Sequence, residues 1–250
     1  MKINKNNYIT YQNKIVFGPL IWNIIHTIAA NLCYDRIKDY NRFILYISEF
    51  LPCEDCKYHF KELIKIYPLS NYIPSSNNFV INNDLKESAL LWTYMIHNDV
   101  NKRINRKSPS FLLVKKYYDK RIINYEDLWS MIHLFSFYTD NYVKFIDFIL
   151  LINRLCYFYD DKLIEILKNY PISSFHGNGN DSILLWTFVI KDELSRCFSY
   201  QSNNNKIKRS SGTSLDIIDS KERDDILLHS NYHLLKENFD NNCTSCSIDI

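Results

Sequence analysis

The chain has 250 residues and a mass of 30.0 kDa, which is long for one compact domain and sufficient for two. Its 30 lysines and arginines nearly balance 28 aspartates and glutamates, so the net charge of +2 argues against a nucleic-acid-binding surface and a polybasic membrane anchor. A hydrophobic content of 46% is sufficient for a core. Neither a GxGxxG nor a GxxxxGK nucleotide-binding loop occurs.

The cysteine content and the apolar stretches indicate the compartment. Seven cysteines are too few for a disulfide-stabilised secreted scaffold. Residues 1–12 lack the apolar core of a signal peptide, and the most apolar stretch, residues 145–159, is too short to span a bilayer. We therefore expect a cytoplasmic protein with no membrane and no nucleic-acid partner. In a reducing compartment, two closely spaced cysteines are more often redox-active or metal-binding than structural.

The hydrophobic period along the chain is that of α-helices. Apolar residues at i, i+3, i+4 and i+7 predict helices over residues 21–28 and 43–50. A third helix is expected over residues 57–66 and a fourth over residues 84–104, with Asp84 as its N-cap. Because alternation typical of strands is nearly absent, we predict an all-α protein.

Three sequence blocks return later in the chain in the same order. The pairs are WNIIH at 22–26 and WSMIH at 129–133, KELIKIYP at 61–68 and KLIEILKNYP at 162–171, and SALLWT at 88–93 and SILLWT at 182–187. The first copy has Cys53 and Cys56 where the second keeps only Cys156, and His97 where the second has Lys191. The second copy therefore resembles a degenerate duplicate that keeps its packing residues and has lost its reactive ones.

Cys53 and Cys56 lie three residues apart at an expected helix start. The unpaired N–H groups and the dipole of a helix N-terminus favour a thiolate there, which predicts a redox pair. The alternative is half of a zinc site, with His59 as one further ligand. The second CxxC, Cys243 and Cys246, lies far beyond zinc-ribbon spacing. We favour the redox pair and keep a helical zinc-binding scaffold as the alternative function.

The composition changes near residue 200. Residues 201–214 are polar and are predicted to form a flexible linker, and the chain then ends near Cys243 and Cys246. A linker of ~40 flexible residues spans about 35 Å, so the terminal pair could reach a distant site. We predict three units: a first helical domain (1–118), a degenerate helical domain without a CxxC (119–199) and a flexible tail with a terminal CxxC (200–250).

Several rings lie on helices that flank the first CxxC. They are Trp22, His26, His59, Trp92 and His97. Each one alone is more often a packing residue, but grouped around a redox pair they could line a pocket for a flat cofactor. His97 and Asn101, four residues apart, would share one helix face.

Three motifs resemble those of the Erv/ALR family of FAD-linked sulfhydryl oxidases. They are Gly18 with Trp22-x-x-x-His26, then Pro52-Cys53-x-x-Cys56-x-x-His59-Phe60, then Trp92-x-x-x-x-His97-Asn98-x-Val100-Asn101. The resemblance implies a four-helix bundle that holds FAD, with a fifth short helix and commonly a homodimer. It implies a thiol oxidase that passes electrons from protein thiols through the CxxC to FAD and then to oxygen, giving a disulfide and hydrogen peroxide.

The resemblance also implies roles for single residues. Cys56 would lie beside the flavin, and Cys53 would be the outer cysteine that exchanges with an incoming thiol. Cys243 and Cys246 would carry electrons from the substrate to that pair. No metal ligands are implied. The positions that match FAD contacts are Gly18, Trp22, His26, Cys56, His59, Trp92, His97, Asn98, Val100, Asn101 and Arg106.

Two departures from the family pattern concern Leu32-Cys33, where the family usually has Tyr-Pro, and Tyr94, where it usually has a cysteine of a structural disulfide. A degenerate second module is familiar in quiescin-type oxidases and in oxidases of large DNA viruses. By that analogy, residues 122–199 would dock on the active module and mimic a homodimer within one chain. The expected partners are protein thiols, including a thioredoxin-like carrier, and oxygen. The expected location is the host cytoplasm or the virion of a large DNA virus.

Overall fold

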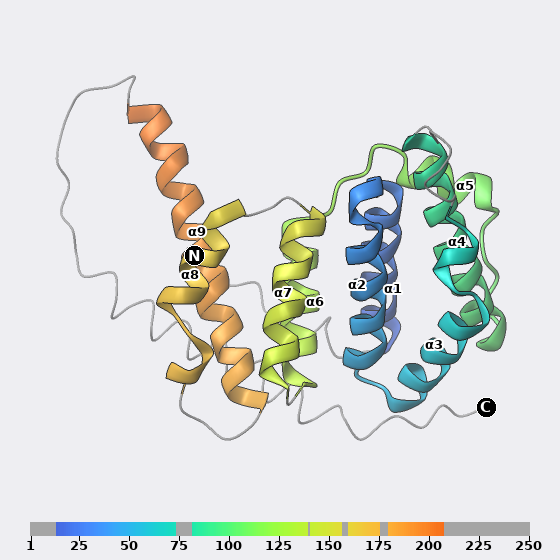
Figure 1. Cartoon of the computed structure of the whole chain (residues 1–250), viewed down its shortest axis with the longest axis horizontal. Helices are drawn as coiled ribbons and strands as arrows, with labels where there is room; N and C mark the ends of the chain where they lie inside the picture. Colours follow the sequence, from blue (N-terminus) through green and yellow to red (C-terminus); the bar gives the residue numbers. More distant parts are fainter. Residues whose placement is uncertain (1–13, 74–81, 140, 157–159, 176–179, 208–250) are drawn as a thin grey trace.

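The structure, a computed structural model, describes residues 14–73, 82–139, 141–156, 160–175 and 180–207 (Figure 1). Its helices are α1 (Lys14–Ala30), α2 (Ile37–Phe50), α3 (Glu54–Ile66), α4 (Asn82–Arg103), α5 (Phe111–Tyr118), α6 (Tyr125–Phe137), α7 (Tyr142–Cys156), α8 (Asp160–Asn169) and α9 (Asn180–Ile207), with short 3-10 turns η3 (Tyr34–Arg36), η4 (Leu69–Asn71) and η5 (Ile172–Ser174). No strand occurs in these ranges. The all-α prediction is therefore confirmed.

Helix boundaries differ from the prediction at several ends. The third helix begins at Glu54 and so includes Cys56, and the fourth begins before Asp84, which lies inside α4 and is not its N-cap. α9 continues to Ile207, so the first residues of the expected linker are helical. The rest of that tail, with Cys243 and Cys246, lies outside the described residues. Among the described helices, none is long and apolar enough to cross a membrane.

The first unit is built by α1 packing along α4 and α2 packing along α3. α2 shows why these segments are helical, because its apolar side chains return every three or four residues. Tyr40, Phe43, Ile44 and Ile47 are all fully buried, and together they form the face of α2 that enters the core. The amphipathic period thus sets both the helix and its orientation.

The helices that follow α5 pack in the same pairs, α6 along α9 and α7 along α8. One hydrogen bond also recurs. The Trp92 indole N–H donates to the Tyr67 carbonyl at 2.7 Å, and the Trp186 indole N–H donates to the Tyr170 carbonyl at 2.8 Å. Both tryptophans are buried. Trp92 links α4 to the residue that follows α3, and Trp186 links α9 to the residue that follows α8. This agreement is what a duplicated helical unit would produce.

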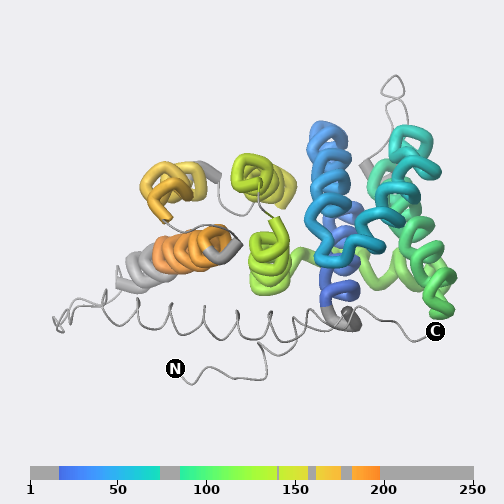
Figure 2. Tube along the Cα trace, turned by 90° about the horizontal axis from the view of Figure 1, so that it is seen from below, coloured from blue at the N-terminus to red at the C-terminus, as the bar shows by residue number. Residues whose placement is uncertain are grey.

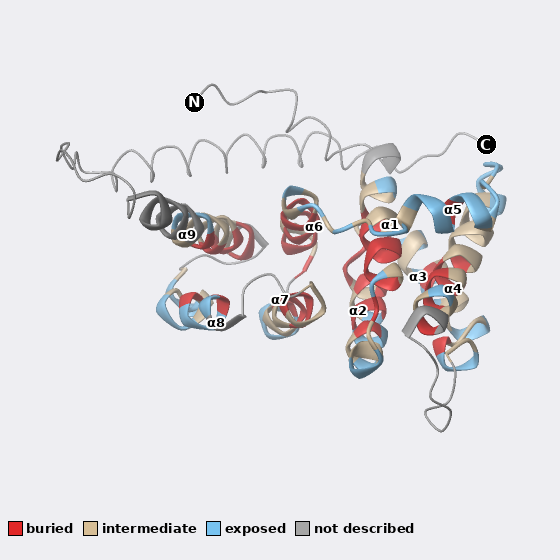
Figure 3. Cartoon of the chain, turned by 90° about the horizontal axis from the view of Figure 1, so that it is seen from above, coloured by how far each residue is buried: buried red, intermediate tan, exposed pale blue. Residues whose placement is uncertain are grey.

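The two sets of helices meet through α1 and α2 on one side and α6 and α7 on the other (Figures 1 and 2). Figure 3 shows buried residues concentrated on these inner helices and exposed residues on α5. Phe43 and Phe50 of α2 face Phe148 of α7, with ring centroids 6.0 and 5.3 Å apart. Ion pairs border this aromatic contact: Arg42 with Asp147, Lys144 with Glu49 (2.8 Å) and Arg154 with Asp39 (3.1 Å). One continuous hydrophobic core therefore joins both sets of helices.

Replacement of Phe148 by alanine should destabilise the whole fold, because a fully buried ring that contacts both Phe43 and Phe50 is lost. We expect the free energy of unfolding, measured by urea denaturation, to fall by about 3–5 kcal/mol. Val143→Ala on the same helix is the control, since Val143 is 63% exposed, and it should change stability by less than about 0.5 kcal/mol. A loss under about 1 kcal/mol for Phe148→Ala would show that the two sets of helices do not stabilise each other.

Candidate functional site

The first CxxC forms the beginning of α3. Cys53 is the N-cap, with extended backbone (φ −118°, ψ 120°), and the Cys56 backbone N–H donates a hydrogen bond to its Sγ at 3.3 Å. A backbone N–H at a helix N-terminus favours negative charge on the sulfur that it contacts. Cys53 is 8% exposed and Cys56 is half-buried. Cys53 is therefore the more buried member of the pair.

Ring contacts connect α3 with α1 and α4. Phe60 follows Cys56 by four residues, which places both on one face of α3. The Phe60 ring meets the Trp22 ring edge-on at 5.8 Å, and Trp22 stacks on His97 with centroids 4.1 Å apart and an interplanar angle of 2°. A continuous series of ring contacts therefore leads from the helix of the CxxC to His97.

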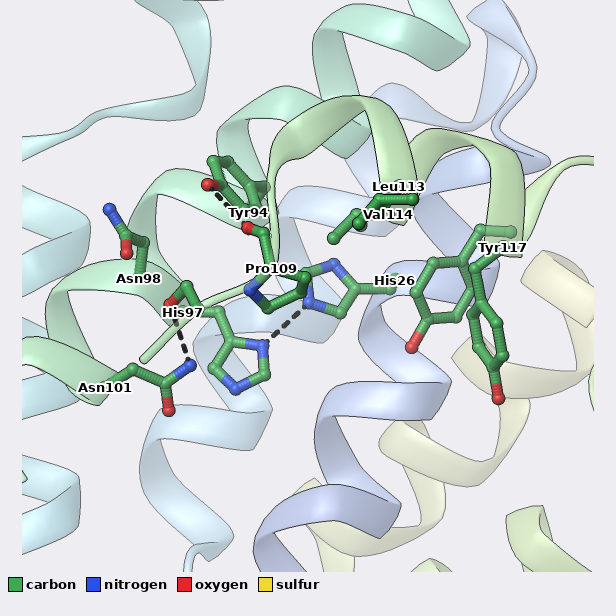
Figure 4. Close-up of a pocket in the computed structure, with 11 residues that line it drawn as sticks. His26, Tyr94, His97, Asn98, Asn101, Pro109, Leu113, Val114 and Tyr117 are labelled. Atoms are coloured by element: carbon green, nitrogen blue, oxygen red, sulfur yellow. Dashed lines mark hydrogen bonds between the residues drawn. The ribbon is translucent and has the colours of Figure 1, made fainter. Parts of the chain in front are cut away.

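His97 lines a pocket of about 440 Å³ between α1, α4 and α5 (Figure 4). In Figure 4, Asn98 and Asn101 lie at one end and Tyr117 lies at the other. The volume is in the range of small-molecule and cofactor sites. The lining residues are His26, Tyr94, His97, Asn98, Asn101, Ser108, Pro109, Leu113, Val114, Tyr117 and Tyr118.

The connection between α4 and α5 closes one side of this pocket. The Asn101 side-chain amide donates to Ser108 Oγ at 3.0 Å, and the Tyr94 hydroxyl donates to the Pro109 carbonyl at 3.0 Å. Asn105 adopts a left-handed conformation (φ 53°), which asparagine tolerates better than most residues, and this turns the chain back at the end of α4. These contacts hold α5 beside α4 as a wall of the pocket.

His26 joins α1 to α4 at the base of the pocket. Its Nδ1 lies 2.7 Å from Thr93 Oγ1, and its Nε2 lies 2.9 Å from His97 Nδ1. Burial, with a smaller contribution from His97, lowers the pKa of His26 to about 3. Burial also lowers the pKa of His97 to about 4. Both rings are therefore neutral at pH 7, and the polar base of the pocket carries no charge from them.

The structure brings four of the predicted cofactor contacts together in the pocket: His26, His97, Asn98 and Asn101. Trp22 does not line it but stacks on His97. Trp92 is 1% exposed and is held by its hydrogen bond to Tyr67, so its ring is part of the core.

The other predicted contacts also lie outside the pocket lining. His59 is half-buried on α3, where its ring contacts Tyr58. Gly18 lies in α1, and no neighbouring element comes close enough to exclude a side chain there. Val100 is half-buried on α4, and Arg106 is exposed in the connection to α5.

Part of the pocket lining was not predicted from the sequence, namely Tyr94, the α4–α5 connection and α5. Phe111, Val114 and Tyr118 follow the i, i+3, i+7 spacing of an amphipathic helix after Ser110, its N-cap. That signal was available. It would have placed a helix at residues 111–118, but not the face of the bundle that the helix covers. Within the residues that the structure describes, no group of three or more His, Cys, Asp or Glu side chains could hold a metal ion.

Residues 20–119 match the model of the Erv1 / Alr family. The chain is 32% identical over 117 residues to a protein of African swine fever virus (isolate Tick/Malawi) named FAD-linked sulfhydryl oxidase, covering 43% of this chain and 84% of that relative. The match to the same protein of isolate Pig/Kenya is 31% over 116 residues, covering 43% and 83%. The FAD-linked sulfhydryl oxidase ERV2 of Saccharomyces cerevisiae is 26% identical over 106 residues, covering 41% and 48%. No solved structure matches the chain.

The fold and the site define an all-α protein with a cysteine pair at the N-terminus of α3 and a pocket lined by rings from α1, α4 and α5. Together with the matched residues, they show that the chain belongs to the Erv1 / Alr family. The resemblance inferred from the three motifs is therefore confirmed.

Burial of the two pocket histidines predicts that the fold loses stability in acid. Below pH 6.5 the unfolded chain takes up protons at His26 and His97 that the folded chain does not, so the stability present above pH 6.5 is lost as the pH falls toward about 4. Each histidine should add a slope of about 1.4 kcal/mol per pH unit in that window. Urea denaturation at a series of pH values measures the slope, and His97→Gln should lower it by about one such increment. An unchanged slope in His97→Gln would contradict the prediction.

Proposed function

We propose that this protein is an FAD-dependent thiol oxidase that forms disulfide bonds in protein substrates and passes their electrons through Cys53 and Cys56 to FAD and then to oxygen, giving hydrogen peroxide. The observation that carries the proposal is the redox pair at the N-terminus of α3, connected by ring contacts to the pocket beside His97. Membership of the family and the names of the relatives support the enzyme class and the cofactor.

The pocket residues fit a flavin nucleotide. A flat ring system packs against aromatic surfaces, and the rings of His97, Tyr117 and Tyr118 line the pocket. Its polar groups require donors and acceptors, which the amides of Asn98 and Asn101 supply. When bound, FAD supplies the chemistry that takes electrons from a dithiol and returns them to oxygen.

The exchange steps take Cys53 as the attacked cysteine, as the resemblance to the family implies. With Cys53 and Cys56 joined as a disulfide, a substrate thiolate attacks Cys53 Sγ, forms a mixed disulfide and releases Cys56 as a thiolate. A second substrate thiolate then attacks the substrate sulfur of that mixed disulfide. The substrate leaves as a disulfide, and Cys53 leaves as a thiolate. The Cys56 N–H, 3.3 Å from Cys53 Sγ, lies where it stabilises the charge released in this second step.

The second set of helices supports a pseudo-dimer within one chain. α6 and α7 cover α1 and α2, and we infer that they take the place of the second subunit of a homodimer. We infer that this copy holds no FAD, because Lys191 stands where the first copy has His97. The viral relatives support an action in the host cytoplasm or the virion.

The visible spectrum of the purified full chain tests the oxidase directly. We expect a flavin band near ~450 nm, one flavin per chain, that bleaches with dithiothreitol. Cys56→Ser should retain the band and fail to bleach, because the pair can no longer deliver electrons from a dithiol. Cys33→Ser, at a cysteine distant in sequence from the pair, should behave as the wild type. A colourless protein with one zinc per chain, even after expression with added FAD, would favour the zinc-binding scaffold.

Cys243 and Cys246 are proposed to pass electrons from protein substrates, or from a thioredoxin-like carrier, to Cys53. The double variant Cys243→Ser/Cys246→Ser should therefore oxidise a reduced, unfolded protein at least about tenfold more slowly, while its oxidation of dithiothreitol stays unchanged. Oxygen consumption measures both rates. Cys197→Ser is the matched control and should leave both rates unchanged. Equal rates for the double variant and the wild type on the protein substrate would exclude the shuttle.

A further inference from the structure

A buried hydroxyl at the base of the pocket lies between a carbonyl oxygen and a histidine nitrogen. Thr93 is 1% exposed, and its Oγ1 lies 2.8 Å from the Leu90 carbonyl oxygen and 2.7 Å from His26 Nδ1. A carbonyl oxygen can only accept, so the hydroxyl donates to Leu90, as threonines in helices commonly do to the preceding turn. Thr93 Oγ1 must then accept a hydrogen bond from His26, which places the His26 proton on Nδ1.

This assignment determines the proton on the next ring. Both histidines are neutral at pH 7 because burial lowers their pKa values, so each carries a single ring N–H. His26 Nε2 is then an acceptor, and His97 Nδ1, 2.9 Å away, must be the donor. The remaining nitrogen of His97, Nε2, is left with an unshared lone pair. The parallel stacking on Trp22 fixes the plane of that ring.

We propose that Thr93 is a positioning residue that fixes the tautomers of His26 and His97, so that His97 offers an unprotonated Nε2 to the ligand of the pocket. Such a nitrogen accepts a hydrogen bond from a hydroxyl, amino or imide group and repels the oxygens of a phosphate. FAD carries all of these groups, so His97 would contact one of its hydroxyl, amino or imide groups and not a phosphate. The identity of the ligand rests on the proposed function, whereas the tautomers do not.

The second copy provides an internal comparison. Thr187 Oγ1 donates to the Leu184 carbonyl at 2.7 Å, as Thr93 does to Leu90, and His133 hydrogen-bonds to the Thr187 backbone. Lys191 replaces the second histidine, and the buried His133 Nε2 has no hydrogen-bond partner. In the first copy the hydrogen bonds therefore continue from Thr93 through His26 to a second histidine, whereas in the second copy they do not continue past His133. Thr187 is the matched control for Thr93.

Two measurements on the purified full chain test the proposal at pH 7. Long-range ¹H–¹⁵N spectra of ¹⁵N-histidine-labelled protein report the tautomer of each ring, and we expect both His26 and His97 to carry the proton on Nδ1. Thr93→Val keeps the shape and removes the acceptor, so both rings should populate the other tautomer and the dissociation constant for FAD should rise about tenfold. Thr93→Ser should restore both, and Thr187→Val should change neither.

The possible outcomes separate the two proposals. A proton on His97 Nε2 in the wild type, or unchanged tautomers in Thr93→Val, would overturn the role of Thr93. Failure of Thr93→Ser to restore the tautomer and the affinity would do the same, because serine keeps the hydroxyl on which the proposal depends. If the protein binds no FAD but both rings carry the proton on Nδ1, the tautomer assignment holds and the flavin site fails.

Discussion

The burial of His26 between α1 and α4 is the constraint on which the site depends. A ring that is 3% exposed has to find partners for both nitrogens within the protein, and Thr93 and His97 of α4 provide them. These two contacts fix the register of α1 against α4. With that register, Trp22 stacks on His97 and meets Phe60, so the position of α3 and its cysteine pair follows from the same helix contact.

The repeated residues make some contacts in both sets of helices and others in only one set. Trp92 and Trp186 make the same hydrogen bond in both, as a shared packing role requires. His133 keeps the place of His26 but has a buried Nε2 without a partner, which costs about 1–3 kcal/mol. The second set of helices tolerates this cost because one continuous core joins it to the first set.

Much of the fold could be predicted from the sequence, because a helical period shows which face of a segment is buried. It does not show what that face meets. Trp92, which its motif predicts to contact a cofactor, is 1% exposed and lies in the core, and its repetition as Trp186 was a signal of packing. Likewise, the sequence motif identifies the α4 side of the pocket, at His97, Asn98 and Asn101. The opposite wall, which comes from α5, depends on how the chain turns at Asn105.

The packing of α1 and α2 against α6 and α7 has a consequence for the range of conditions in which the protein is folded. Surfaces on separate subunits part on dilution, whereas surfaces on one polypeptide meet at an effective concentration set by the connecting chain. The short segment between α5 and α6 fixes that concentration. The contact that stabilises α1 and α2 is thus independent of the concentration of the protein, and α2 is the helix on which α3, with its cysteine pair, packs.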